Sequence, residues 1–160
     1  MTEETTYTMS QAHLLFATDF HGKTWELLDK KQRTPIEDEL MLDYAHASMA
    51  HWRAAGTSVR HQRGEWLLAR TYAVVGAQEL AVHHARRCLQ LLESNQSEME
   101  DFDFAFAYEA LARALAIKGE NAEAKKYIEM AQKAGEALKS KEDRDVFFGE
   151  FNGGNWNGLK

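Results

Sequence analysis

The residues best suited to bind a ligand are arginines in the middle third of the chain. Residues 57–95 hold five arginines, no lysine and three acids, a formal charge of +2 in a chain whose net charge is −6. A planar guanidinium can form two parallel hydrogen bonds to a carboxylate or phosphate, whereas lysine acts as a point charge. Recognition of an anionic group is the chemistry that these residue types favour.

Two sets of residues repeat one spacing that could build such a site. They are Arg63, Trp66 and Arg70, and, 43 residues later, Phe106, Glu109 and Arg113. Steps of three and four residues place each set along one face of a helix. An arginine closes both sets, and each set carries an aromatic ring that could form an apolar wall beside a bound group.

The histidines give a second, weaker candidate. A small-molecule or metal site, with or without enzymatic activity, could use His51, Glu65, His84, Asp103 and Glu109. Neither the H-x-x-x-H spacing nor the E-x-x-H spacing of helical metal sites occurs, so we expect no metal and no cofactor. Whether His51, His84 and Glu65 come together stays open at this point.

Signals for catalysis are few. The single cysteine, Cys88, falls where a small buried residue is expected, and burial keeps a thiol unreactive. The chain has no glycine-rich phosphate loop and no G-x-S-x-G or H-E-x-x-H motif. We therefore predict no catalytic residue and favour a binding protein over an enzyme.

The composition narrows the class of protein. A chain of 160 residues fits one domain, and one proline leaves long helices uninterrupted. The net charge of −6 argues against nucleic acid as a partner. No apolar run reaches membrane-spanning length, and the acidic first residues do not resemble a secretory signal. We expect a cytoplasmic protein without a membrane partner.

Apolar residues recur every three or four positions, which predicts helices throughout. We expect Ser10 to cap the first helix. Thr34 should cap the second helix, which has Pro35 at its first position and stops at Gly56. Further helices are predicted near 58–76, 77–93, 103–118, 121–138 and 141–148, followed by an irregular tail. The helices form pairs joined by short turns that contain glycine.

The last two complete pairs have equivalent positions. In one they are Leu68, Ala69, Tyr72, Gly76, Ala81, Ala85 and Cys88, and in the other Leu111, Ala112, Leu115, Gly119, Ala124, Ile128 and Ala131. Small residues let the two helices of a pair approach closely. This spacing resembles that of tetratricopeptide repeats over residues 60–138. The stretches 51–93 and 101–119 more specifically resemble a family of small bacterial tetratricopeptide-like proteins.

The resemblance implies one all-α domain of six to seven helices, in which antiparallel hairpins stack as a short right-handed solenoid. Residues 10–56 would be a diverged capping hairpin, 58–93 and 103–138 the repeats, and 141–160 a C-terminal cap and tail. It also implies that the first helix of each hairpin lines a concave groove that binds a protein or peptide.

In that groove the two sets would meet, with Arg70 and Arg113 gripping an acidic or C-terminal peptide segment between them. We predict that replacing both arginines with Ala removes binding and leaves the fold intact. The alternative is structural: these arginines pair with Glu65 and Glu109 and hold the hairpins in register.

Aromatic residues in the tail suggest a further interaction. Phe147 and Phe148 could close the end of the last hairpin, as a solenoid requires. Phe151 and Trp156 could instead dock into a groove, either in the same chain or in a second copy. A homodimer is therefore a possible state of the protein.

Overall fold

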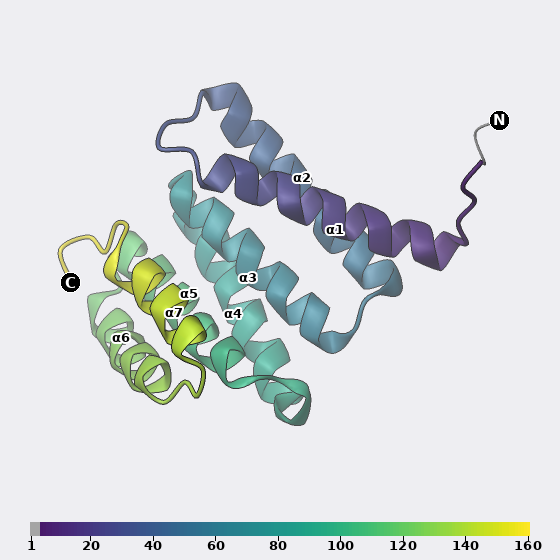
Figure 1. Ribbon diagram of the computed structural model, residues 1–160. Coiled ribbons are helices and arrows are strands. Elements are labelled where there is room, and N and C mark those ends of the chain that lie inside the picture. The colour runs from purple at the N-terminus through teal and green to yellow at the C-terminus, as the bar shows by residue number, and fades with distance from the viewer. Residues whose placement is uncertain (1–3) are drawn as a thin grey trace.

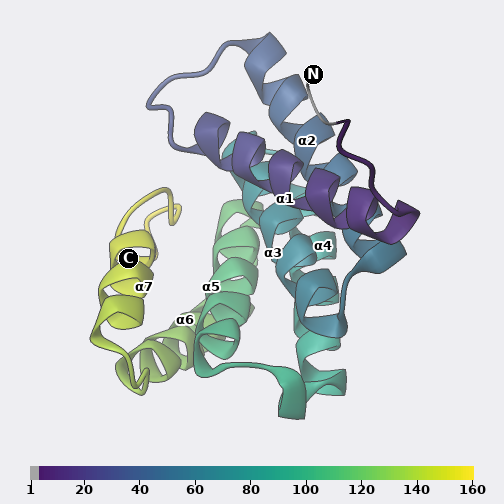
Figure 2. The ribbon, with the colours of Figure 1, turned by 45° about the vertical axis from the view of Figure 1, so that its right-hand side comes forward.

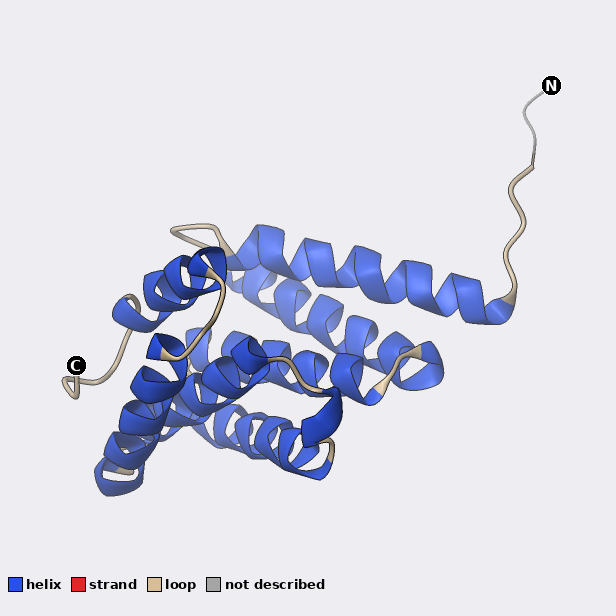
Figure 3. Ribbon diagram, turned by 60° about the horizontal axis from the view of Figure 1, so that its bottom comes forward, coloured by secondary structure: helices blue, strands red, loops and turns tan. Residues whose placement is uncertain are grey.

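The computed structural model describes residues 4–160, and these form an all-helical structure without strands (Figures 1 and 3). The helices of this part of the chain are α1 (Met9–Leu28), α2 (Pro35–Ala55), α3 (Ser58–Val74), α4 (Gln78–Ser94), α5 (Asp101–Lys118), α6 (Asn121–Glu136) and α7 (Lys141–Asn152), with a 3₁₀ turn, η1 (Gln96–Glu98). None of these helices combines the length and the apolar composition that crossing a bilayer requires.

The helices pack as three successive hairpins and a final single helix. The pairs are α1 with α2, α3 with α4, and α5 with α6, and each hairpin rests on the next through α2 against α3 and α4 against α5. Helix α7 folds back onto α5 and α6 (Figures 1 and 2). The predicted all-α array of stacked hairpins is confirmed.

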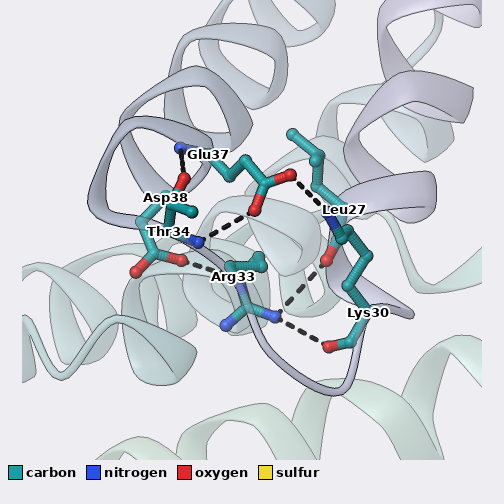
Figure 4. Close-up of polar contacts among 6 residues, drawn as sticks. All are labelled: Leu27, Lys30, Arg33, Thr34, Glu37 and Asp38. Atoms are coloured by element: carbon teal, nitrogen blue, oxygen red, sulfur yellow. Dashed lines mark hydrogen bonds and ion pairs between the residues drawn. The ribbon is translucent and has the colours of Figure 1, made fainter.

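The second helix begins where the sequence predicts, at a strong local signal. The Thr34 side chain accepts a hydrogen bond from the Glu37 amide, and the Glu37 carboxylate accepts one from the Thr34 amide (Figure 4). This reciprocal pair satisfies two of the amides that a helix start leaves free. Arg33 ties the preceding turn to α2 through Asp38 and to the end of α1 through the Leu27 carbonyl.

The turns of the two predicted repeats have the same geometry. Gly76 ends α3 with φ of 78°, and Gly119 ends α5 with φ of 88°. Positive φ is accessible to glycine without the steric cost of a Cβ atom. In both turns the next amide bonds back five residues, from Ala77 to the Tyr72 carbonyl and from Glu120 to the Leu115 carbonyl. The turns are thus equivalent at the predicted offset.

Small residues do lie inside the hairpins. Ala69, Ala81, Ala112 and Ala124 are all buried in the main core, which also contains Cys88. Without large side chains at these positions the paired helices approach closely, as the repeat spacing predicts. The core continues through Phe147, Phe151 and Trp156, so α7 and the tail close its C-terminal end.

Several helix boundaries differ from the prediction. Helix α1 begins two residues earlier, because Thr8 rather than Ser10 caps it in a reciprocal bond pair with Gln11. Helix α5 begins at Asp101, since the side chains of Glu100 and Asp103 cap that end. Helix α7 continues to Asn152 because Phe151 packs into the core, which holds the last turn helical.

Candidate functional site

A cavity of about 440 Å³ opens on the face formed by α1, α3, α5 and α7. Its lining includes Arg63, Trp66 and Phe106 of the predicted site, together with His21, Trp25, Asp29, Gln62, Phe102, Asp103, Val146 and Glu150. Its volume lies in the range of protein pockets that bind small ligands or ligand side chains. The first helix of every hairpin contributes to it, as expected for the concave side of a hairpin array.

Aromatic rings form a continuous line along the wall of this cavity and on into the core. Trp25 of α1 stacks on Trp66 of α3 with ring centroids 5.7 Å apart, and Trp66 meets Phe106 of α5 edge to face at 5.5 Å. Phe106 in turn contacts Phe147 of α7 at 5.2 Å. Each ring comes from a different helix, so the line fixes the spacing of the four elements that shape the cavity.

Arg63 lies in the cavity wall with its guanidinium already bound. Its Nε and Nη2 donate to the two carboxylate oxygens of Asp103 at 2.8 and 3.1 Å, and its guanidinium carbon lies 4.7 Å from the centre of the Phe102 ring. Asp103 is 2% exposed and also accepts the Glu100 amide. The paired carboxylate raises the pKa of Arg63 further above its usual value. The forked grip predicted for an outside anion is thus filled by a residue of the same chain.

Arg70 lies outside the cavity lining and crosses to the last helix. Its Nη2 donates to Glu150 of α7 at 2.6 Å, and both side chains are partly exposed. The predicted pairing with Glu65 does not occur, because Glu65 faces the opposite side of α3 toward Arg53 and His84. Arg70 therefore anchors α7 across the concave face.

Arg113 and Glu109 also lie outside the cavity, under the C-terminal tail. Arg113 Nε donates to Glu109 Oε1 at 2.6 Å, as the structural alternative predicted. Its remaining donors bond the carbonyls of Glu150 and Gly153 at 2.9 and 3.0 Å, and Trp156 lies over its guanidinium at 4.1 Å. With Arg113 only 3% exposed, the shared Arg70–Arg113 grip on a ligand is not assembled.

The tail docks into its own chain. Trp156 is 4% exposed, and its indole N–H donates to the Phe151 carbonyl at 3.0 Å. The Asn157 amide group donates to the carbonyl of Ala116 in α5. The sequence left open whether Phe151 and Trp156 dock into the same chain or into a second copy. In the structure they dock into the same chain, against Arg113, at one end of the predicted groove.

Two side chains in the cavity wall carry buried polar atoms without partners. These atoms are Oε1 of Gln62 and Nε1 of Trp66, one acceptor and one donor a helical turn apart on α3. The Gln62 side chain is otherwise fixed, because its Nε2 donates to Cys88 Sγ at 3.1 Å. An unpaired buried polar atom is costly in free energy. Because both atoms are fully buried, a ligand in the cavity does not reach them, and they carry no argument for binding.

His21 at the cavity is held in its neutral form. Burial, and to a lesser degree the charge of Arg60, lower the pKa of His21. Its Nε2 accepts the indole N–H of Trp25 at 3.2 Å, a bond that requires an unprotonated nitrogen. His21 therefore fixes the Trp25 ring and adds no charge to the cavity.

Of the residues of the alternative histidine site, only His84 and Glu65 come together. His51 bonds His13 through the two Nδ1 atoms at 2.8 Å, and His84 bonds Glu65 at 2.6 Å. The other two carboxylates of the set are those of Asp103 and Glu109, and they accept hydrogen bonds from Arg63 and Arg113. Within residues 4–160 no group of three His, Cys, Asp or Glu side chains is arranged to hold a metal ion. Cys88 is fully buried, and burial raises the pKa of its thiol far above the usual range.

Sequence reasoning named four of the eleven residues that line the cavity and missed the other seven. His21 and Trp25 come from the hairpin that matched the repeat pattern poorly, and Val146 and Glu150 come from the helix treated only as a cap. One signal was available, because Gln62 lies four residues before Trp66 and Phe102 four residues before Phe106, on the helix faces already singled out. Comparisons of the chain with known families, with curated proteins and with solved structures found no match.

Proposed function

We propose that the protein is a protein-interaction module whose concave cavity receives a large apolar or aromatic side chain of a peptide partner. The observation that carries this proposal is the cavity itself, walled by Trp25, Trp66, Phe102 and Phe106 and open between four helices. Aromatic side chains are the commonest anchors of protein interfaces, and they fill pockets of this kind. The resemblance to tetratricopeptide repeats supports a peptide-binding role on this face.

The charges around the cavity favour an apolar anchor over an acidic one. Arg63 is neutralised by Asp103, and Arg70 by Glu150. Asp29 is exposed at the opening and forms no ion pair with residues 4–160. An acidic peptide would have to displace a carboxylate that is already bound with good geometry, whereas a neutral or basic peptide would not.

The test uses the full chain as bait for a display library of random linear peptides. Val146 lies on the cavity rim with 61% of its surface exposed, so Val146→Trp introduces a ring that can fill the opening without disturbing the core. Ile36→Trp is the matched control, because Ile36 is also a β-branched, exposed residue on a helix but lies on α2 away from the cavity. Circular dichroism confirms that both variants keep the helical fold.

We expect enriched peptides with a large aromatic or aliphatic residue that bind the wild type and Ile36→Trp equally and Val146→Trp at least about tenfold more weakly. Equal binding to Val146→Trp, enrichment of acidic peptides without an apolar anchor, or no enrichment at all would each overturn the proposal.

A further inference from the structure

The outer surface of the first hairpin is apolar and is not covered by any element within residues 4–160. Of the ten large hydrophobic residues that are substantially exposed in the described part of the chain, five lie in one short segment. They are Tyr7, Met9, Leu14, Leu15 and Phe16. Ten of the twenty residues of α1 are exposed, and only Ala17 and Thr24 are fully buried (Figure 3). A cluster of large exposed apolar side chains typically marks an interaction surface.

This surface also lacks charge. From Thr5 to Thr18 the sequence contains no Asp, Glu, Lys or Arg, in a chain where such residues make up 28%. On the neighbouring helix α2, His51 contacts His13 and Phe16, and the residues one turn to either side of His51 are Ala47 and Ala54. The part of α2 that adjoins α1 is thus uncharged around His51, whereas the exposed Arg53 is turned toward Glu65 of α3.

We propose that this surface, formed by the N-terminal half of α1 and the adjoining turns of α2, binds a second copy of the same chain. The two copies would meet through the same face, related by a two-fold axis. The net charge of −6 makes contact between most other surfaces of two copies repulsive, whereas an uncharged patch can face itself without that penalty.

The other occupants fit less well. An interfacial membrane helix is rich in Lys and Arg on its polar side, but α1 carries only one such residue, Lys23. A head-to-tail stack would set this patch against the C-terminal end of another copy. That end is closed by α7, whose outward residues include Lys141, Glu142 and Asp145. Charged side chains there would be buried against apolar ones, which is unfavourable.

Sedimentation velocity and light scattering of the full chain over a concentration series test the proposal. Leu15→Glu places a carboxylate in the patch, and Leu80→Glu on α4 is the matched control, since the two leucines are 47% and 45% exposed. We expect the wild type and Leu80→Glu to reach the mass of a dimer and no more. For Leu15→Glu the dimer dissociation constant should rise by about tenfold or more, because each copy loses an apolar contact and gains a buried charge.

Three results would overturn the proposal: a wild-type monomer at every concentration, a mass that grows beyond the dimer as in head-to-tail assembly, or equal weakening by both substitutions. The outcome is independent of the peptide cavity, because Val146 and Leu15 lie on different helices and the dimer test needs no peptide.

Discussion

Replacement of Arg113 tests most directly whether the arginines of the predicted site are structural. The sequence alone predicted that Arg113 can be removed without loss of the fold. The structure predicts the opposite, because Arg113 is 3% exposed, pairs with the 1% exposed Glu109 and bonds the backbone of the C-terminal segment. Arg113→Ala would leave the Glu109 carboxylate buried without its partner and would detach the tail.

The expected magnitude follows from that geometry. Removing one member of a buried ion pair costs about 3–5 kcal/mol of the free energy of unfolding. Domains of this size have about 5–15 kcal/mol in total, and each kcal/mol shifts Tm by about 2–4 °C. We therefore expect Arg113→Ala to lower Tm by roughly 6–20 °C, within the range that these figures allow.

Urea denaturation followed by far-UV circular dichroism measures the change. The double variant Glu109→Gln/Arg113→Met removes both charges and should be more stable than Arg113→Ala alone. Arg87→Ala is the control, since Arg87 is exposed on α4, and it should change stability by less than about 0.5 kcal/mol. If Arg113→Ala stays within about 1 kcal/mol of the wild type, the reasoning is refuted, because such a value is far below the cost of an unpaired buried charge.

Two further predictions concern the buried carboxylate of α3 and the packing of the glycines. Burial tends to raise the pKa of Glu65, but hydrogen bonds and charges from His84 and Arg53 outweigh it and hold the pKa below the usual 4.5. A lowered carboxyl pKa contributes stability that is complete above pH 4.5 and is lost as pH falls through the folded-state pKa. The difference in unfolding free energy between wild type and Glu65→Gln should therefore shrink below pH 4.5. A difference that is constant with pH would contradict this. Gly135→Ala should destabilise by about 1–3 kcal/mol, because the new methyl would overlap the Phe147 ring. Gly22→Ala, in an open stretch of α1, should instead stabilise by about 0.5–1 kcal/mol. Thermal denaturation measures both variants, and a change in stability of the same sign for Gly135→Ala and Gly22→Ala would refute the packing argument.

Local signals in the sequence determined most of the helical framework. Thr34 and Pro35 start α2, and Gly76 and Gly119 end α3 and α5, because a cap or a positive φ depends only on residues a few positions apart. The recurrence of small residues also predicted the paired helices, since close approach of two helices needs small side chains wherever they touch. Even the groove lining was partly predicted, in Arg63, Trp66 and Phe106.

Only the tertiary structure decided what each of those side chains meets. Arg70 finds Glu150 from 80 positions away, and Arg113 is covered by a tail about 40 positions further on. Trp25 joins the cavity from a hairpin whose sequence does not match the repeat. The spacing of residues along a helix fixes which face they share, but not which distant segment packs on that face. That choice depends on how all the helices together bury their apolar surfaces, and here it placed the chain's own carboxylates and tail where the sequence suggested an outside ligand.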